Sequence, residues 1–398
     1  MRSIENPKVA WSGKGLQYTE EEISLVAAVM RDADPLTQGK HQQQFEARFK
    51  EYTGAKAAFA VSHCSAALQL SAMLTKIGPG DEVILPAHTF AATAIPFGRT
   101  GATLVWADID PETRLISVKS IEQKISPRTK VIVVVHLYGL MADMDPIMEI
   151  ARRHHLFVIE DAAQSAGASY KGKKAGSIGD LGCFSFHTHK NISTLGEGGM
   201  LTVNRPEWID LIPGLRHNGM RPFSEPRDRY WIPTMTNVDF DWEGVWPYKF
   251  CLGEVQCALG SKLLERLDAI SEKRRSRAQR FLAALSDFPE LSFQKTPAGQ
   301  DHVYHLLTAK YDGRAFGKTR DDFMELMAFT HKVQVIVQYY PLYRYPLFIR
   351  AGFGKADCPH TDDFYDNMVS FPFHHWLSEE NVDYMIKAAR STLASLRG

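Results

Sequence analysis

The residues from Leu181 to Gly199 read Leu-Gly-Cys-Phe-Ser-Phe-His-Thr-His-Lys-Asn-Ile-Ser-Thr-Leu-Gly-Glu-Gly-Gly. The mostly apolar run 181–186 predicts a short buried strand, and the glycines at 196, 198 and 199 permit a tight turn with close backbone approach. Lys190 therefore stands between a strand and a glycine-rich turn. A single lysine is most often a solvated surface charge, so the meaning of Lys190 depends on the rest of the chain.

Short apolar runs alternate with helical segments on both sides of this stretch. The predicted strands cover residues 58–61, 82–85, 103–106, 131–137, 157–159, 181–186 and 200–203, with helices over 19–34, 66–76 and 146–154 and a polar hairpin turn at 171–174. Strands that are apolar along nearly their whole length are typical of parallel sheets covered by helices on both faces. We therefore predict an α/β fold with a mostly parallel sheet between helices.

Two domains are predicted. Residues 1–260 form a large α/β domain that includes an N-terminal arm and helix, and residues 261–398 form a smaller C-terminal α+β domain. The second domain begins with a basic amphipathic helix over 263–285 and closes with a helix after Ser378. The chain has 398 residues, of which 44% are hydrophobic, so it can supply a sizeable core.

Composition excludes several classes of function. The 46 Lys and Arg residues balance 46 Asp and Glu residues, so overall charge does not favour binding to nucleic acid or to an anionic membrane. The longest aliphatic run, 131–135, is too short to span a bilayer, and the N-terminus has no apolar signal segment. Five scattered cysteines without a Cys-x-x-Cys pair indicate a reduced, cytoplasmic setting. The histidine pairs at 154–155 and 374–375 lack metal-site spacing, and no metal is expected.

Candidate ligand-binding residues stand at the ends of predicted strands. Asp161 closes the run 157–161 at its carboxyl end, where open α/β sheets bind ligands, and Gln164 follows it. The other interpretation of Asp161 is a helix cap. Ser185 lies near the end of the strand 181–186 and offers a hydroxyl.

Two more candidates follow other strands. Cys64 and Ser65 stand where a strand turns into a helix, so backbone N–H groups and the Ser65 hydroxyl can bind a phosphate there. The alternative for Ser65 is a simple N-cap. Phe90 follows the strand 82–85 and either stacks on a ligand ring or packs in the core.

These residues together meet the requirements of pyridoxal phosphate. That cofactor needs a lysine for a Schiff base, a carboxylate for its pyridinium nitrogen, a flat face against its ring and donors for its phosphate. Lys190, Asp161 and Phe90 would supply the first three. The hydroxyls at positions 65 and 185 would supply the last, and the Gln164 amide would reach the ring's phenolic oxygen. We therefore predict pyridoxal phosphate as the cofactor.

The chain also resembles a known family over nearly its whole length. The resemblance rests on residues 61–68, 78–84, 86–90, 108–110, 136–139, 160–164, 179–186, 190 and 196–199. Together these segments resemble the DegT/DnrJ/EryC1/StrS family of pyridoxal-phosphate-dependent sugar aminotransferases. The resemblance implies aminotransferase fold type I, with a large α/β domain and a smaller α+β domain.

The resemblance also implies a role for each candidate residue. It makes Lys190 the Schiff-base lysine and Asp161 the partner of the ring nitrogen. The remaining cofactor-binding residues are then Gln164, Phe90, Cys64, Ser65 and Ser185, joined by Lys249, which the neighbouring subunit of a homodimer with shared active sites would place at the phosphate. L-glutamate is the implied amino donor, and Arg216 and Arg221 are candidates for its carboxylates.

The implied acceptor is a keto or aldehyde sugar used in cell-surface polysaccharide, such as lipopolysaccharide, or in secondary-metabolite biosynthesis. Both a nucleotide-linked keto-hexose and a free keto-sugar acid, such as an oxidised 3-deoxyoctulosonate, remain open. The sequence leaves two other functions open. A sugar 3-dehydratase of the same fold has a histidine in place of the lysine, and His189 adjoins Lys190; a non-catalytic cofactor-binding regulator would not need the lysine, aspartate and glutamine together.

Several positions depart from the family pattern. Cys64-Ser65 replaces the usual Gly-Thr, one extra residue lies between Lys190 and Gly196, and Gln338 stands where a histidine is common. The order around His217 is also altered. The segment 222–247 is rich in arginine and tryptophan, which is compatible with a pocket wall or with an interface.

Overall fold

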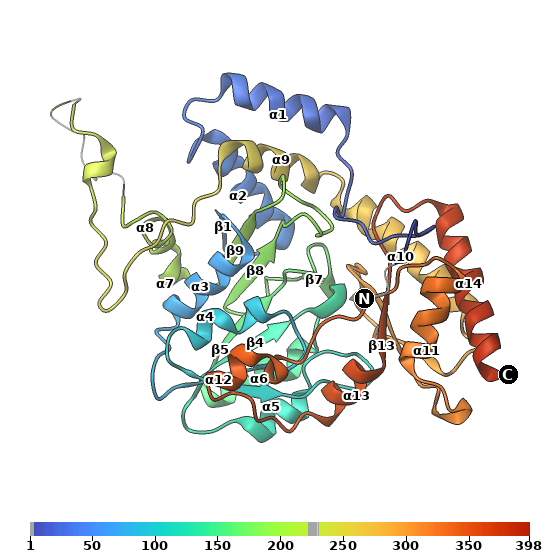
Figure 1. The fold of residues 1–398 in the computed structure, drawn as a ribbon. Coiled ribbons are helices and arrows are strands. Elements are labelled where there is room, and N and C mark those ends of the chain that lie inside the picture. Colours follow the sequence, from blue (N-terminus) through green and yellow to red (C-terminus); the bar gives the residue numbers. More distant parts are fainter. Residues whose placement is uncertain (1–3, 222–228, 230) are drawn as a thin grey trace.

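The structure is a computed structural model, and it describes residues 4–221, 229 and 231–398. Its centre is a seven-stranded sheet with the order β1-β9-β8-β5-β4-β2-β3. These strands are β1 (Ala57–Val61), β2 (Glu82–Pro86), β3 (Thr103–Ala107), β4 (Thr129–Val135), β5 (Phe157–Asp161), β8 (Leu181–Ser185) and β9 (Gly199–Val203). Only β9 runs antiparallel to its neighbours in this sheet. The predicted α/β class with a mostly parallel sheet is confirmed (Figure 1).

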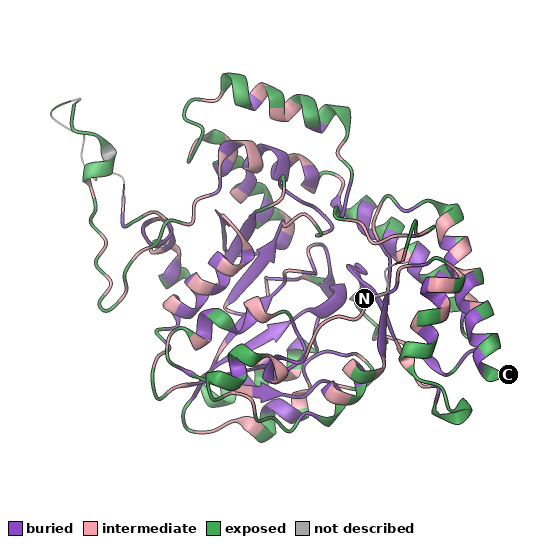
Figure 2. Ribbon diagram, in the orientation of Figure 1, coloured by how far each residue is buried: buried purple, intermediate pink, exposed green. Residues whose placement is uncertain are grey.

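Helices cover both faces of the sheet. Alternate strand residues enter two separate cores: Ile132 and Val134 join one, whereas Val131 and Val133 join the other. This alternation follows from the two-residue period of a strand. The first core includes residues of α2 (Lys40–Thr53), α6 (Met144–His154) and α9 (Glu254–Leu264), and the second those of α3 (Cys64–Leu74) and α4 (Ile95–Gly98). Figure 2 shows the strands buried between these layers.

Several helices that precede α10 (Leu267–Ala284) were not predicted from the sequence, and two of them show why. The first is α2, whose buried face carries Phe45 and Phe49 together with Gln42 and Thr53, so its apolar stripe is weak. The second is α5 (Val118–Lys124), which is too short to show a clear period. The predicted first helix is confirmed as α1 (Glu20–Asp32), and Thr19 forms its capping box with Glu22.

The C-terminal part forms its own core around a three-stranded antiparallel sheet. Its strands are β10 (Leu291–Phe293), β12 (Leu307–Tyr311) and β13 (Met368–Phe371). The helices beside them are α10 (Leu267–Ala284), α11 (Arg320–Glu325) and α14 (Glu379–Arg397). The predicted helix over 263–285 begins late, at Leu267, because residues 263–264 complete α9.

The chain crosses between the two parts more than once. Val9 joins the core of the C-terminal part and pairs with Val333. Conversely, Leu342 and Phe348 pack into the core on one face of the large sheet. The division at residue 260 stays a prediction.

Short elements complete the fold. The predicted hairpin at 171–174 is confirmed as β6 (Ser169–Tyr170) paired with β7 (Lys173–Lys174), and β6 also pairs with β11 (Gln300–Asp301). The remaining helices are α7 (Pro206–Ile209), α8 (Ile212–Leu215), α12 (Pro346–Arg350) and α13 (Pro359–Asn367). Within the described ranges, no helix is both long and apolar enough to cross a membrane.

Candidate active site

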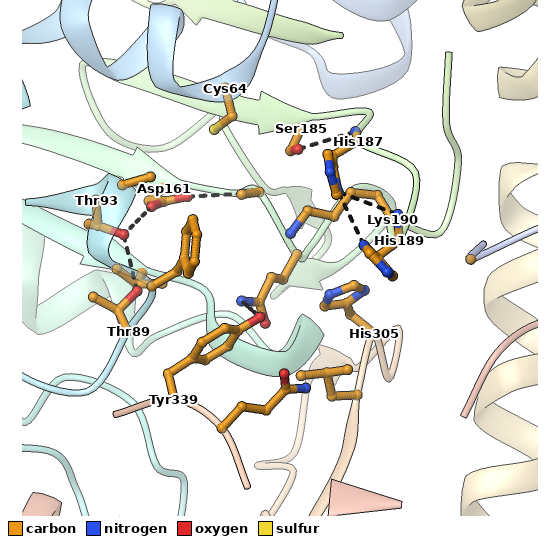
Figure 3. A pocket seen from close by; sticks show the side chains of 18 of the residues that line it. Cys64, Thr89, Thr93, Asp161, Ser185, His187, His189, Lys190, His305 and Tyr339 are labelled. Carbon is orange, nitrogen blue, oxygen red and sulfur yellow. Dashed lines mark hydrogen bonds between the residues drawn. The ribbon is translucent and has the colours of Figure 1, made fainter. Parts of the chain in front are cut away.

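A cavity of about 670 Å³ lies beside the carboxyl ends of β5 and β8. Of the eight predicted site residues, seven line it: Cys64, Ser65, Phe90, Asp161, Gln164, Ser185 and Lys190. They come from distant parts of the large domain, and the parallel strands bring them to one edge of the sheet. Figure 3 shows Asp161 and Thr93 on one side of this space and Lys190 on the other.

Asp161 is fixed by two hydrogen bonds at the end of β5. The hydroxyl of Thr93 donates to Oδ2 at 2.7 Å, and the Ala163 amide donates to Oδ1 at 3.1 Å. Burial raises the pKa of Asp161, while these hydrogen bonds and the charge of Lys190 oppose the rise. A buried carboxylate held in this way is suited to accept a hydrogen bond from a protonated ring nitrogen. The helix-cap interpretation is wrong, because residues 162–168 form turns and no helix follows Asp161 before β6.

The neighbouring Glu160 has a structural role instead. Its side chain lies in the protein interior, where Nε2 of His136 is 2.8 Å from Oε2. The amides of Gly176, Ile178 and Gly179 also donate to its carboxylate. Because successive strand residues face opposite sides of a sheet, Glu160 supports the loop before β8, whereas Asp161 faces the cavity.

Lys190 lies in the connection from β8 to β9, which is folded back on itself. The amide of Phe186 donates to the Gly198 carbonyl, and the amide of Thr188 donates to the Gly196 carbonyl. Within this connection, Leu195 has a left-handed φ of 64°. Burial lowers the pKa of Lys190, and the nearby acidic groups of Cys64 and Asp161 oppose this shift. A larger neutral fraction makes the amine a better nucleophile and base than a solvated lysine.

The start of α3 provides a place for an anion. His63, not Ser65, is the N-cap, because its Nδ1 accepts the Ala66 amide at 2.9 Å. Among the described residues no partner is seen for the Ser65 hydroxyl or for the amides of Cys64 and Ser65, which leaves these donors for a ligand. Ser185 lies close by on β8, and its Oγ accepts the His187 amide at 3.3 Å.

Gln164 and Phe90 contact Tyr339, which comes from the C-terminal part. Gln164 accepts the Tyr138 amide at 2.7 Å through Oε1, and its Nε2 lies 3.3 Å from the Tyr339 hydroxyl. Phe90 is 55% exposed, and its ring packs edge-on against Tyr339 at 5.8 Å. The core interpretation of Phe90 is wrong, because its ring faces open space in the cavity.

Lys249 is the predicted residue that does not line this cavity. It is exposed and forms an isolated antiparallel backbone bridge with His217, and the carbonyl of its neighbour Phe250 accepts the Ser62 amide just after β1. The arginine candidates also lie elsewhere. Arg216 is buried in an ion pair with Glu46, with Nη1 to Oε1 at 2.5 Å. Neither it nor Arg221 is among the lining residues.

The segment 222–247 is only partly described, since residues 222–228 and 230 lie outside the described residues. None of its described residues lines the cavity. Trp231 is 63% and Trp246 86% exposed. The pocket-wall interpretation finds no support in the described residues of this single chain.

Sequence reasoning missed the other end of the cavity. Its walls come from the N-terminal arm and the C-terminal part, which supply Trp11, Lys14, Arg274, His305, Tyr339 and His374. The loop before Lys190 adds His187 and His189, whose rings stack at 5.1 Å. The two histidines were visible beside the lysine, but no local pattern marks the others.

Comparison with known proteins identifies the family. The sequence profile of the DegT/DnrJ/EryC1/StrS aminotransferase family matches residues 17–390. The chain belongs to this family. It is 37% identical to the spore coat polysaccharide biosynthesis protein SpsC of Bacillus subtilis, over 93% of this chain and 94% of that protein. It is 35% identical to the GDP-perosamine synthase of Caulobacter vibrioides, over 89% and 91%.

A solved structure extends the comparison to the cofactor. The PLP form of Spr1654 from Streptococcus pneumoniae has a TM-score of 0.85 and 25% identity, covering 98% of this chain and 99% of that one. The residues of the present chain fit pyridoxal phosphate as well, because its cavity combines a lysine, a fixed carboxylate, an exposed aromatic ring and a helix N-terminus. The chain is a pyridoxal-phosphate-dependent sugar aminotransferase, as the sequence predicted.

Proposed function

We propose that this aminotransferase moves the amino group of L-glutamate to a keto or aldehyde carbon of a sugar, with Lys190 as the lysine that binds the cofactor. The observation that carries the proposal is the pairing of Lys190 with Asp161 across one cavity at the strand ends. A regulator that only held the cofactor would not need a lysine whose pKa is lowered by burial.

The chain's own residues account for the steps that need a protein group. When bound, pyridoxal phosphate withdraws electrons from the carbon that carries the transferred amine. Asp161 would keep the ring nitrogen protonated, and Gln164 Nε2 would orient the ring oxygen. The Lys190 amine, held half-buried in the loop, would remove a proton from the donor α-carbon and return it at the adjacent position. The walls of the cavity would exclude water from these transfers.

The acceptor is proposed as a sugar destined for a polysaccharide or another amino-sugar product. Two similar proteins are named for such pathways, the spore coat polysaccharide protein and the GDP-perosamine synthase. A nucleotide-linked keto-hexose and a free keto-sugar acid are both compatible with a cavity of about 670 Å³. The dehydratase alternative loses support, because it requires replacement of the lysine that the chain retains at position 190.

We also propose a homodimer in which each subunit completes the other's site, located in the cytoplasm. The described residues 231–247 project from the body of the molecule and expose large apolar side chains such as Trp231, Met235 and Trp246 (Figure 1). Exposed apolar side chains gathered on a projection favour a protein partner. Lys249 follows this segment in the chain by two residues, which is compatible with its reaching the cofactor phosphate in a second subunit. All five cysteines are free, which fits a reducing compartment.

Incubation with glutamate tests the proposal. Without an acceptor, the purified holoenzyme should release one 2-oxoglutarate per bound cofactor and stop, because the amino group is retained by the cofactor. Adding the correct keto sugar should restart the reaction, and a panel of nucleotide-linked and free acidic keto sugars would identify it. Release of no 2-oxoglutarate from a cofactor-loaded protein would contradict the choice of donor.

A further inference from the structure

The end of the cavity beyond Lys190 is rich in groups that carry or accept positive charge. Lys14, Arg274 and the imidazoles of His187, His189 and His305 line it, against a single carboxylate, Glu197. Glu197 is turned toward His187, with Oε1 3.8 Å from Nε2. Figure 3 shows His187, His189 and His305 gathered on the Lys190 side, away from Asp161.

Arg274 is the most unusual member of this group. It is only 2% exposed, yet within the described residues it has no carboxylate at ion-pair distance. Its Nε donates to the Tyr304 carbonyl at 2.9 Å, and its Nη2 donates to the carbonyls of His305 and Phe373 at 2.8 and 2.5 Å. Nη1 makes no hydrogen bond to the described chain. A buried guanidinium normally has a counter-ion, and here both the charge and the spare donor are next to the cavity.

The surrounding groups act on one another through space. The pKa of His305 is held well below its usual range by burial first, and then by the positive charges of Lys190 and Arg274. His305 therefore lies within electrostatic range of both cations and stays neutral. Because the His305 imidazole is neutral, an anion bound among these groups would be attracted by Arg274 and not by a charge on His305.

The N-terminal arm is held firmly enough to contribute a fixed cation. The Gly15 amide donates to the Thr188 carbonyl at 2.7 Å, and the Thr188 hydroxyl donates to the Gly13 carbonyl at 3.0 Å. On the other side, the Trp376 indole donates to the Lys14 carbonyl at 3.4 Å. Lys14 is thus carried on a strap bound to both the lysine loop and the C-terminal part. The indole Nε1 of Trp11, on the same strap, is buried without a partner and also borders the cavity.

We propose that Arg274, assisted by Lys14 and His189, forms a subsite that binds the carboxylate of the amino donor. Every α-amino acid donor carries a carboxylate on the carbon whose amine reacts, so a cation must lie near the lysine. Arginine is suited to this task because its planar fork matches a carboxylate. This inference rests on the proposed function and replaces Arg216 and Arg221, which the sequence suggested. The same chemistry would also suit the carboxylate of an acidic acceptor sugar.

Calorimetric titration of the holoenzyme with glutarate tests the subsite directly. Glutarate has the two carboxylates of glutamate but no reactive amine or carbonyl, so binding is measured without turnover. We expect Arg274→Gln to weaken glutarate binding roughly ten-fold or more. His189→Gln and Lys14→Met, at more exposed positions, should weaken it roughly two- to five-fold.

Matched variants control for unspecific charge effects. Arg280→Gln removes an arginine on the same helix α10 that pairs with Glu379 at the surface, and Lys8→Met removes an arm lysine that packs over the Tyr384 ring. Both should bind glutarate as the parent protein does. If Arg274→Gln does not fold, because three carbonyls lose their donor, the Lys14→Met and His189→Gln variants still decide the question.

The outcomes distinguish a failure of the carboxylate subsite from a failure of the proposed function. Glutarate affinity that is unchanged in the Arg274, Lys14 and His189 variants would overturn the subsite, even if the parent protein transaminates glutamate. Failure of the parent protein to carry the cofactor's visible absorbance or to release 2-oxoglutarate would instead count against the proposed function. If a 3-deoxy sugar acid binds in an Arg274-dependent manner and glutarate does not, the subsite stands and its carboxylate belongs to the acceptor. Binding of neither anion to the parent holoenzyme would overturn it.

Discussion

The two ends of the cavity are built in different ways. The end near Asp161 is made from residues at the ends of neighbouring strands and at the first turn of α3, all within the large domain. The opposite end is assembled from the N-terminal arm, α10 and loops of the C-terminal part, which meet only in the folded chain. The first end is therefore suited to hold the cofactor, and the second faces the space left for the substrate.

The two ends also differ electrically. Asp161 places a negative group at the cofactor end, where a ring nitrogen would need it. The far end instead collects Arg274, Lys14 and several imidazoles. Lys190 lies between the two, so its amine would serve the cofactor on one side and the substrate on the other. The following changes test this division, starting with the largest expected effect.

Replacing Lys190 should abolish catalysis. In Lys190→Ala, we expect turnover with glutamate to fall by about 10³-fold or more, because the variant loses the group that moves the proton. The melting temperature should stay close to that of the parent. Lys173→Ala, at the exposed tip of the β6–β7 hairpin, is the control and should retain full activity. Full glutamate-dependent activity of Lys190→Ala would contradict the role of Lys190 as the group that moves the proton between the two ends of the cavity.

The adjacent carboxylates of β5 should respond in opposite ways. Asp161→Asn should lower kcat/KM by about 10²- to 10³-fold with little change in stability, since a preorganised charge at the cofactor is lost. Glu160→Gln should lower the free energy of unfolding by about 2–4 kcal/mol, because its buried carboxylate accepts three backbone amides and lies 2.8 Å from His136 Nε2. Its activity per folded molecule should stay within a few-fold of the parent. Steady-state kinetics and thermal melts of both variants test this assignment. A loss of activity in Glu160→Gln together with a loss of stability in Asp161→Asn would reverse it.

The arm offers a smaller and more local test. A Cβ on Gly15 would stand 2.2 Å from the Lys190 carbonyl oxygen, so Gly15→Ala must displace either the strap or the lysine loop. A displacement of about 1 Å at a catalytic group lowers kcat about 10²-fold. A Cβ on Gly13 meets nothing within 4 Å, and Gly13→Ala should therefore behave as the parent. Equal activity of the two variants would show that the arm does not position Lys190.

The smallest effect concerns the proton affinity of Lys190. Its pKa is lowered by burial and partly restored by the charge of Asp161. In the cofactor-free protein, an amine-directed reagent followed by peptide mapping should therefore label Lys190 with a midpoint below the value of about 10.4 for a free lysine. In Asp161→Asn the midpoint should fall further, because an opposing negative charge is gone. An upward shift in that variant would place the carboxylate out of range of the amine.

The sequence predicts the Asp161 end of the cavity better than it predicts the opposite end. Asp161, Gln164 and Ser185 were predicted because each lies at or just beyond a strand end, where parallel sheets gather ligand-binding groups. The mixed sheet and the hairpin were predicted from period and turn residues. Helix α2 was missed because half of its buried positions are polar.

The far end of the cavity could not be predicted in this way. Arg274 is one of several basic residues along α10, and only tertiary packing distinguishes it from Arg275 or Arg280. His305 follows no motif and is brought to the site by the fold of the C-terminal part. Arg216 appeared available for a substrate but is occupied by Glu46 and the Ala60 carbonyl. The local sequence predicts which residues end a strand. Which charged side chains lack an ion-pair partner depends on tertiary packing and cannot be predicted from it.

The central claim is that Lys190 is the residue that binds the cofactor. Borohydride reduction of the holoenzyme makes the bond between a lysine and pyridoxal phosphate permanent, and peptide mass spectrometry then locates it. We expect the added mass on the peptide that contains Lys190 and on no other. The same mass on another lysine, or its absence from a protein that still transaminates glutamate, would contradict the account.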